Sequence, residues 1–165
     1  SYIIHSGAPY TIFRSAAIFG PGDQFTTELV RMLRISPGIF LVPGDGSTML
    51  QPLWVEDLVT CLTLAMQDPT LAGQTIAVGG AEYLRFREII QIVMAAARTR
   101  RWLIPVSPVY LRGLSVFFEN ISKNFPLSVF WQDYLAVDRT CNLDTLPRLF
   151  GLMPMRFARQ LEYLN

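Results

Sequence analysis

Apolar residues recur at helical spacing in four stretches of the chain. A helix presents one face through residues three and four positions apart, so this spacing predicts amphipathic helices. Phe25, Leu29, Met32 and Leu33 show the pattern in the first stretch. The predicted helices cover residues 25–35, 55–66, 86–97 and about 108–122.

Short runs of β-branched and aromatic residues alternate with these helices and predict strands. The first run, Tyr10–Phe13, leads to Gly20-Pro21-Gly22-Asp23, where two glycines and a proline require a turn. Strands are predicted at 10–13, 39–42, 75–78 and 102–104, with further turns at 36–38, 43–46 and 79–80. The alternation of strands and helices predicts an α/β fold.

The two ends of the chain give weaker patterns. Residues 1–7 have the pattern of a helix end stopped by a glycine, with a proline just beyond it. From Pro126 onward the sequence predicts short helices that are interrupted at 138–142 and 151–154.

The segment Val109–Ile121 is rich in Leu, Val and Phe and carries few charges. It fits a core helix, a dimer surface or a helix that lies on a membrane. Core is the default interpretation, because only Arg112 and Lys123 offer a basic face for a membrane.

The composition indicates one domain with more apolar surface than a small soluble domain needs. The chain has 165 residues, 51% of them hydrophobic, and a mean hydropathy of +0.31. It contains no run of about 18 apolar residues, so a membrane span is not expected. We therefore expect part of the surface to face another part of the same protein, a second copy of the chain by self-association, or a membrane.

Charge and cysteine content exclude several classes of protein. With 14 basic and 13 acidic residues, the charge implies no nucleic acid and no strongly charged partner. Arg98, Arg100 and Arg101 crowd the end of a predicted helix and are interpreted as a solvated cap that favours the helix dipole. Cys61 and Cys141 are too few for a disulfide framework or a metal site, and indicate reduced thiols of a cytoplasmic protein.

Four segments of the chain carry motifs of one known family, in the order and spacing of that family. They are YTIFRSAAIFGPGD at 10–23, PGDG with QPLWVEDL at 43–46 and 51–58, GG with FREII at 79–80 and 86–90, and LFGLMP at 149–154. They resemble the NAD(P)-dependent epimerase/dehydratase group, the extended or atypical short-chain dehydrogenases/reductases. The branch that the chain most resembles includes the nucleotide-binding accessory subunit of respiratory complex I.

This resemblance implies the C-terminal fragment of a Rossmann-type protein. The expected architecture is a set of late parallel strands plus a small mixed α+β substrate domain rich in helices. Residues 1–24 would end the dinucleotide-binding sheet and residues 25–165 would form the substrate domain, all within one domain on the substrate side of a longer protein.

The chain lacks the two motifs on which that family's chemistry depends. It has no Gly-rich loop that could cradle a pyrophosphate at a helix N-terminus. The family's catalytic pair is a Tyr with a Lys four residues later, whereas Lys123, the only lysine, has Glu119 at that distance. We expect no catalytic residue here, no cofactor bound to the fragment, and NAD or NADP in the intact parent. The partners would be the upstream dinucleotide-binding half and a small-molecule substrate.

The resemblance also places candidate contact residues after the first strand. Arg14, Ser15 and Phe19 would border the nicotinamide, with Ser15 standing where the family usually has Pro. Loops at the carboxyl ends of parallel strands face the ligand crevice, so Asp23 and Gln24 would line the substrate cleft. The alternative for Asp23, which we favour, is a cap on the helix that follows.

Gln51 is the third candidate substrate residue. By resemblance it stands where nucleotide-sugar epimerases carry Asp, while Leu50 and Trp54 stand at the positions of an Arg and a His. Leu cannot make the bidentate hydrogen bonds with which Arg grips a diphosphate, so this departure argues against a nucleotide-sugar substrate. Asp57, in the first turn of its helix, and His5, the only histidine, are both interpreted as structural.

Two functions follow from these observations, beside a third interpretation as an independent small-molecule-binding module. The first is the substrate-binding C-terminal region of an NAD(P)-dependent epimerase/dehydratase-like oxidoreductase, inactive alone. The alternative is a non-catalytic assembly domain of a nucleotide-binding protein that docks on a larger complex or a membrane. The two are distinguished by whether the upstream sequence carries the Tyr–Lys pair.

Overall fold

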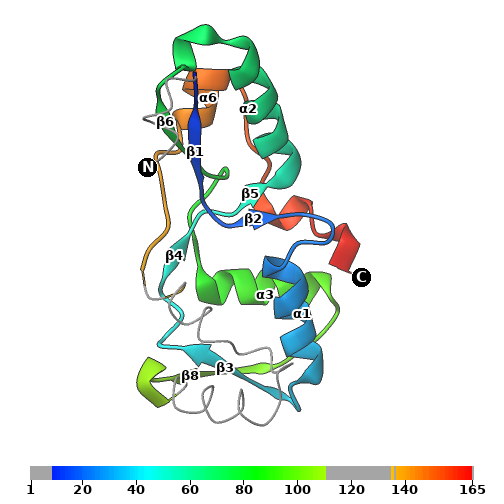
Figure 1. Cartoon of the computed structure of the whole chain (residues 1–165). Helices are drawn as coiled ribbons and strands as arrows, with labels where there is room; N and C mark the ends of the chain where they lie inside the picture. Colours follow the sequence, from blue (N-terminus) through cyan, green and yellow to red (C-terminus); the bar gives the residue numbers. More distant parts are fainter. Residues whose placement is uncertain (1–8, 111–134, 136, 165) are drawn as a thin grey trace.

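The computed structural model describes residues 9–110, 135 and 137–164 of the chain (Figure 1). Its helices of four residues or more are α1 (Phe25–Ile35), α2 (Val55–Gln67), α3 (Phe86–Ala96) and α6 (Thr145–Phe150). Its strands are β1 (Ile12–Ser15), β2 (Ile18–Phe19), β3 (Ile39–Pro43), β4 (Met49–Leu50), β5 (Leu53–Trp54), β6 (Thr75–Val78), β7 (Leu84–Arg85) and β8 (Trp102–Val106). The predictions for residues 1–7, including His5, and for residues 111–122 lie outside the described residues.

Parallel pairing dominates the described strands and confirms the predicted α/β fold. β1 pairs with β6, β2 with β5 and β3 with β8, all in parallel, while β4 and β7 are antiparallel. In Figure 1 the molecule is elongated: β1, β6, α2 and α6 lie together at one end, and α1, α3, β3 and β8 lie at the other. The β2–β5 pair lies between these two regions.

The larger hydrophobic cluster forms where α1 packs against α3. Leu29 and Leu33 of α1, and Ile89 and Ile90 of α3, are at most 1% exposed. These positions are those that the helical spacing predicted to face a core. The last described segment completes the cluster with three buried apolar side chains, Phe157, Leu161 and Leu164.

A smaller cluster lies between the β1–β6 pair and the helices α2 and α6. Its buried members are Leu53, Cys61, Ala65, Leu71, Ile76, Val78 and Leu146. Phe13 of β1 packs at its margin and stacks on Phe150, with ring centroids 6.0 Å apart. The boundary expected after residue 24 stays a prediction; in the structure, the unit that contains β1 draws β6 and α2 from beyond that boundary.

Helix bounds follow the sequence closely. α1 occupies the predicted residues 25–35, and α2 and α3 each end one residue away from the predicted bound. β6 occupies the predicted residues 75–78. The predicted interruption at 151–154 begins at Gly151, which ends α6 with a φ of +61°, a left-handed conformation that glycine adopts without strain.

Strand β1 begins two residues later than predicted. Tyr10 and Thr11 are held by the turn before β6 instead of by the ladder. The Gly73 N–H donates to the Tyr10 carbonyl at 2.6 Å, and the Thr11 hydroxyl donates to the Leu71 carbonyl at 2.9 Å. β-propensity alone does not reveal this competing set of hydrogen bonds.

Strand β8 continues through Pro105 to Val106, past the predicted end at residue 104. Pro105 has no N–H to donate, and prolines are tolerated in strands that are paired on one edge only. Among the described strands β8 pairs with β3 alone, so its other edge can hold the proline.

Helix α2 keeps apolar side chains on its outer surface. Val59, Leu62 and Met66 are 53%, 40% and 89% exposed, and their spacing of three and seven residues places them on one face. Part of the predicted surplus of apolar surface is therefore found on α2. None of the helices in the described ranges has both the length and the apolar character needed to cross a bilayer.

Candidate functional site

The carboxyl ends of β1 and β6 lie side by side. Ser15 is opposite Val78 in the register, and the Ala16 N–H donates to the Val78 carbonyl at 2.9 Å. Arg14 and Ser15 are both exposed. Since ligands of open parallel sheets bind beyond these ends, Arg14 and Ser15 lie where a bound group could reach them.

Phe19 lies in the core. Its side chain is 0% exposed, and its ring meets Phe157 edge-on at 4.8 Å and Trp54 at 5.3 Å between centroids. The contact of Phe19 with a cofactor stays a prediction. Its buried ring leaves Arg14 and Ser15 as the exposed members of the predicted cofactor-binding trio.

The Asp23 carboxylate gathers hydrogen bonds from both sides of the loop before α1. Oδ1 accepts from the backbone N–H groups of Thr26 at 2.9 Å and Thr27 at 3.0 Å, and Oδ2 accepts from the Gly20 N–H at 2.9 Å. The Thr26 hydroxyl lies 2.8 Å from Oδ2 and the Tyr163 hydroxyl lies 3.3 Å from it. Asp23 therefore caps the first turn of α1, as we favoured, and fixes the loop.

Two neighbours show how tightly this loop is held. A side chain on Gly20 would place its Cβ 2.5 Å from Cγ1 of Val55, so only glycine fits without a shift. Burial raises the pKa of the Tyr163 phenol, opposed by its hydrogen bond with Thr26 and reinforced by the Asp23 charge. Tyr163 therefore remains protonated at neutral pH. Gln24, the other predicted substrate residue of this loop, is exposed and makes no cap hydrogen bond.

Gln51 is fully buried, and both ends of its amide are occupied. Nε2 donates to the Gly80 carbonyl at 2.8 Å, and Oε1 accepts from the Cys141 N–H at 2.7 Å. A Cβ on Gly79 would overlap the Gln51 side chain, and one on Gly80 would overlap the Pro52 carbonyl. Gln51 thus joins three distant segments, and its contact with a substrate stays a prediction.

The positions that the resemblance assigns to an arginine and a histidine are packed and apolar. Leu50 is 0% exposed, and Trp54 lies between the rings of Phe19 and Tyr163, at 5.3 and 6.2 Å. Neither side chain can donate to a diphosphate through a cationic group. The departure noted in the sequence therefore coincides with hydrophobic packing at these two positions.

Asp57 ties α2 to the last segment of the chain. Its Oδ2 accepts from the Met155 N–H at 2.8 Å, and the residue is 7% exposed. Burial raises the pKa of this carboxyl, opposed by the Met155 hydrogen bond. Burial also raises the pKa of the Cys61 thiol to about 11, which keeps it an unreactive thiol.

The two carboxylates that the structure places near the predicted site are both engaged within the protein. Asp23 and Asp57 act as backbone acceptors. Within residues 9–110, 135 and 137–164, no three His, Cys, Asp or Glu side chains lie close enough to hold a metal ion.

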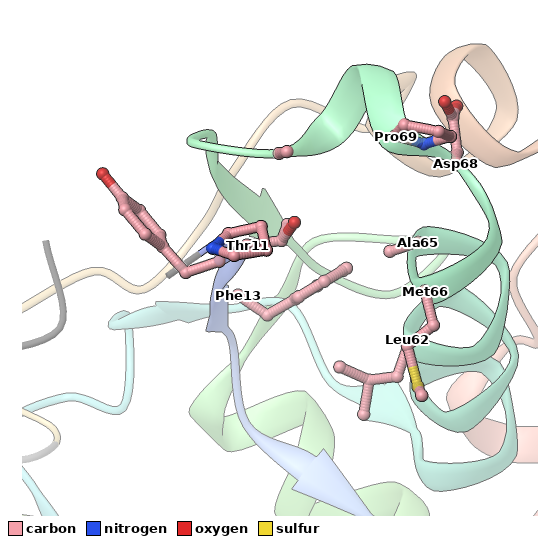
Figure 2. Close-up of a pocket in the computed structure, with 10 residues that line it drawn as sticks. Thr11, Phe13, Leu62, Ala65, Met66, Asp68 and Pro69 are labelled. Atoms are coloured by element: carbon pink, nitrogen blue, oxygen red, sulfur yellow. The ribbon is translucent and has the colours of Figure 1, made fainter. Parts of the chain in front are cut away.

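Strand β1 also borders an apolar groove of about 530 Å³ (Figure 2). Phe13 from β1 and Leu62, Ala65 and Met66 from α2 line it, as Figure 2 shows. Among the described strands only β6 pairs with β1. Backbone groups alternate in direction along a parallel strand, so those of Phe13 and Ser15 point to the edge where no described strand lies.

Sequence reasoning missed the role of the C-terminal segment at this site. The segment was predicted only as short helices, yet Phe157 packs on Phe19 and Tyr163 bonds to the Asp23–Thr26 pair. The apolar spacing of residues 157, 161 and 164 was a usable signal for a buried face. The partners of this face, which lie far away along the chain, could not be predicted from spacing.

Comparison with known proteins finds relatives of low identity. Uncharacterized protein YbjS of Escherichia coli is 25% identical over 154 residues, which cover 88% of this chain and 45% of that protein. The uncharacterized UDP-glucose epimerase YtcB of Bacillus subtilis is 24% identical over 89 residues, 53% of this chain and 28% of that protein. The chain spans less than half the length of both. No family model matches it.

Solved structures align with nearly the whole chain. The epimerase Mth375 of Methanothermobacter thermautotrophicus aligns with 99% of the chain and 45% of its own length, at a TM-score of 0.69 and 17% identity. The UDP-glucuronic acid 4-epimerase of Bacillus cereus, solved with UDP-glucuronic acid and NAD, aligns with 98% of the chain and 46% of its own, at 0.66 and 16%. The chain therefore has the α/β fold of part of these epimerases.

Proposed function

We propose that this chain is the substrate-side C-terminal region of an NAD(P)-dependent epimerase/dehydratase-like oxidoreductase. In this proposal it shapes the substrate pocket and covers the nicotinamide end of the cofactor, and it catalyses nothing by itself. The observation that carries the proposal is the alignment of almost the whole chain with under half of enzymes such as the one solved with NAD. The absence of a Gly-rich phosphate loop from the sequence supports the same assignment.

The edge of β1 that no described strand pairs supports an upstream half as the partner. Parallel sheets are normally covered on both faces and extend over several strands, whereas the described part of this sheet has only β1 and β6. A preceding strand could pair with the backbone of Phe13 and Ser15, and its helix could fill the groove beside Leu62 and Met66. Such a strand would continue the sheet to the cofactor.

In the assembled protein, Arg14 and Ser15 are the proposed nicotinamide neighbours. Both are exposed at the carboxyl end of β1. Asp23 and Gln51 would contribute to the substrate side mainly by holding their loops in place, and the exposed Gln24 would face the substrate. The packed Leu50 argues against a nucleotide-sugar substrate, since this position offers no cation to a sugar-nucleotide diphosphate.

Calorimetry tests the assignment directly. Titration of the chain with NAD, NADH, NADP and NADPH should give no heat of binding up to millimolar concentration. A micromolar dissociation constant for any of the four would show that the chain contains the dinucleotide site and would overturn the proposal.

The assembly role is the second candidate. It is favoured by the exposed apolar face of α2, where Met66 is 89% exposed. Sequencing upstream of Ser1 separates the two: an intact Tyr–Lys pair supports the enzyme, and its loss supports a scaffold. In either case we propose that the chain alone self-associates through this face, which light scattering at increasing concentration would detect.

A further inference from the structure

A groove with arginines along it runs beside α3, far from β1. It occupies about 690 Å³ near the C-terminal end of the helix and continues into a second hollow of about 330 Å³. Arg87, Gln91 and Met94 line it from one face of α3, since they are three or four residues apart, and Arg98 lines it from just beyond the end of the helix. The opposite wall is formed by Arg100, Arg101, Trp102 and Leu103.

The groove is lined by positively charged side chains and by no carboxylate. None of its lining residues is acidic, and within the described part of the chain no ion pair reaches Arg87, Arg98 or Arg100. The chain as a whole has a net charge of only +1, so this cluster is a local concentration rather than a reflection of composition. An arginine guanidinium can donate two parallel hydrogen bonds to two oxygens of one phosphate, so a cluster of arginines suits a phosphate group.

One arginine is structural and fixes the wall of the groove. Arg101 donates to the Arg100 carbonyl at 2.8 Å and reaches the Arg34 carbonyl at 3.4 Å, at the end of α1. Its Nε and the Thr99 hydroxyl are buried without a described partner. Arg98 and Arg100 remain exposed, so their guanidinium groups are available to a ligand.

The adjoining face of the β3–β8 sheet is exposed and apolar. Ile39 and Trp102 are partners in the register and are 47% and 81% exposed, and Ile104, two residues further along β8, is 41% exposed. The alternate residues Phe40 and Val42 are buried in the larger cluster, so the exposed side chains share the other face. Trp102 also lines the groove, which makes the arginines and this face continuous.

We propose that this arginine groove and the exposed Ile39–Trp102–Ile104 face together bind an anionic lipid surface. Arginines next to an exposed tryptophan and aliphatic side chains are the combination that holds proteins at the boundary of headgroups and acyl chains. Single-stranded nucleic acid would instead call for several aromatic side chains as stacking platforms, whereas the neighbours of Trp102 are isoleucines. The inference does not depend on the proposed function.

Vesicle sedimentation tests the proposal with the whole chain. Vesicles of 70% phosphatidylcholine and 30% phosphatidylglycerol should bind the chain, and pure phosphatidylcholine should bind it far more weakly. The double variant Arg98→Gln/Arg100→Gln should weaken binding to the anionic vesicles by about 25-fold, at about fivefold for each arginine near the surface. Raising the salt from 50 to 500 mM should weaken the binding of the unaltered chain for the same reason.

Control variants distinguish binding by this surface from an attraction of the whole basic chain to anionic vesicles. Arg156→Gln/Arg159→Gln removes the same charge from two exposed arginines outside the groove and should leave vesicle binding unchanged. Trp102→Ser should weaken binding to anionic vesicles without removing its salt dependence. Circular dichroism of each variant confirms that the fold is retained.

Three results would overturn the proposal. One is equal vesicle binding by the unaltered chain and the Arg98→Gln/Arg100→Gln variant, both folded. Another is equal loss of binding in the Arg156→Gln/Arg159→Gln control. The third is that the chain does not bind anionic vesicles but binds inorganic phosphate or a short single-stranded RNA saturably. That result would assign the groove to a soluble anion or to RNA.

Discussion

The two ends of the molecule are built from the same kinds of element but differ in completeness. Around α1 and α3, the helices face each other and the C-terminal segment closes the core with Phe157 and Leu164. Around β1 and β6, the cluster is smaller, one strand edge is unpaired among the described strands, and Met66 of α2 projects outward. The α1–α3 core is closed by residues of this chain, although the β3–β8 face beside it stays exposed. The β1–β6 end instead exposes the apolar face of α2 next to a strand edge that no described strand pairs.

The motifs that resemble the epimerase/dehydratase group contain two kinds of polar residue. The loop Gly20–Asp23 and the Gln51–Gly80 pair lie in the motifs that resemble the epimerase/dehydratase group, yet their polar groups are used to hold the fold. Arg14 and Ser15 are the exposed polar groups at the strand end. The two kinds of residue should therefore respond differently to substitution.

The largest effect is expected from Phe157→Ala in the complete region. This ring is 1% exposed and packs on Phe19, so its loss should lower the free energy of unfolding by about 3–5 kcal/mol. Phe13→Ala in the incomplete region should cost about 1–2 kcal/mol in the chain alone, because that ring is half-buried. Urea unfolding measures both, and equal losses would remove the distinction between the regions.

A second comparison uses the neighbours Asp23 and Gln24. Asp23→Ala removes the acceptor of the α1 cap and of the Gly20 N–H, and should cost about 2 kcal/mol. Gln24→Ala, the matched control, should change the stability by less than about 0.5 kcal/mol, as surface substitutions do. Thermal and urea unfolding measure both variants; a stable Asp23→Ala variant would indicate that the carboxylate is not a cap.

Arg85→Thr should stabilise the complete region by about 1 kcal/mol. The Glu88 carboxylate already accepts from the Arg85 N–H at 2.7 Å, which is half of a capping box. A guanidinium cannot accept the reciprocal hydrogen bond, whereas a threonine hydroxyl can. Arg85→Ala is the control without an acceptor and should bring no such gain. A lower melting temperature for Arg85→Thr would contradict the assigned helix start.

The smallest effect concerns Asp57, which joins α2 to the segment that closes the other region. Burial raises the pKa of this carboxyl above that of an ordinary aspartate, so its protonated form favours folding. That contribution is present at low pH and is lost as pH rises through the folded-state pKa. Asp57→Asn keeps an acceptor for Met155, so it should melt higher than the unaltered chain at pH 7 and equally at pH 3.

Much of the fold could be predicted because local patterns and packing agree. The stripe Phe86, Ile89, Ile90 and Val93 is both helical in spacing and buried in the larger cluster, so α3 was found with an error of one residue. The two-residue strands could not be found. β2 and β5 are strands only because they pair with each other, with Ile18 opposite Leu53. A run of two residues is too short to show a periodic pattern.

The sequence predicted where the residues of the candidate site lie better than it predicted what each of them does. The Gly20–Asp23 turn and the cap followed from residue types. The burial of Gln51 did not, because it depends on the Cys141 N–H, which arrives from a segment far along the chain. The same holds for Tyr163 and Asp23, whose contact joins opposite ends of the sequence.

Amide hydrogen exchange of Phe13 and Ser15 tests most directly whether the β1 region is completed by an upstream half. In the chain alone these two amides should exchange orders of magnitude faster than the Arg14 amide, which faces β6. In a longer protein that includes the residues before Ser1, the same two amides should become protected to the level of Arg14. Protection that is identical in the two proteins would contradict the account.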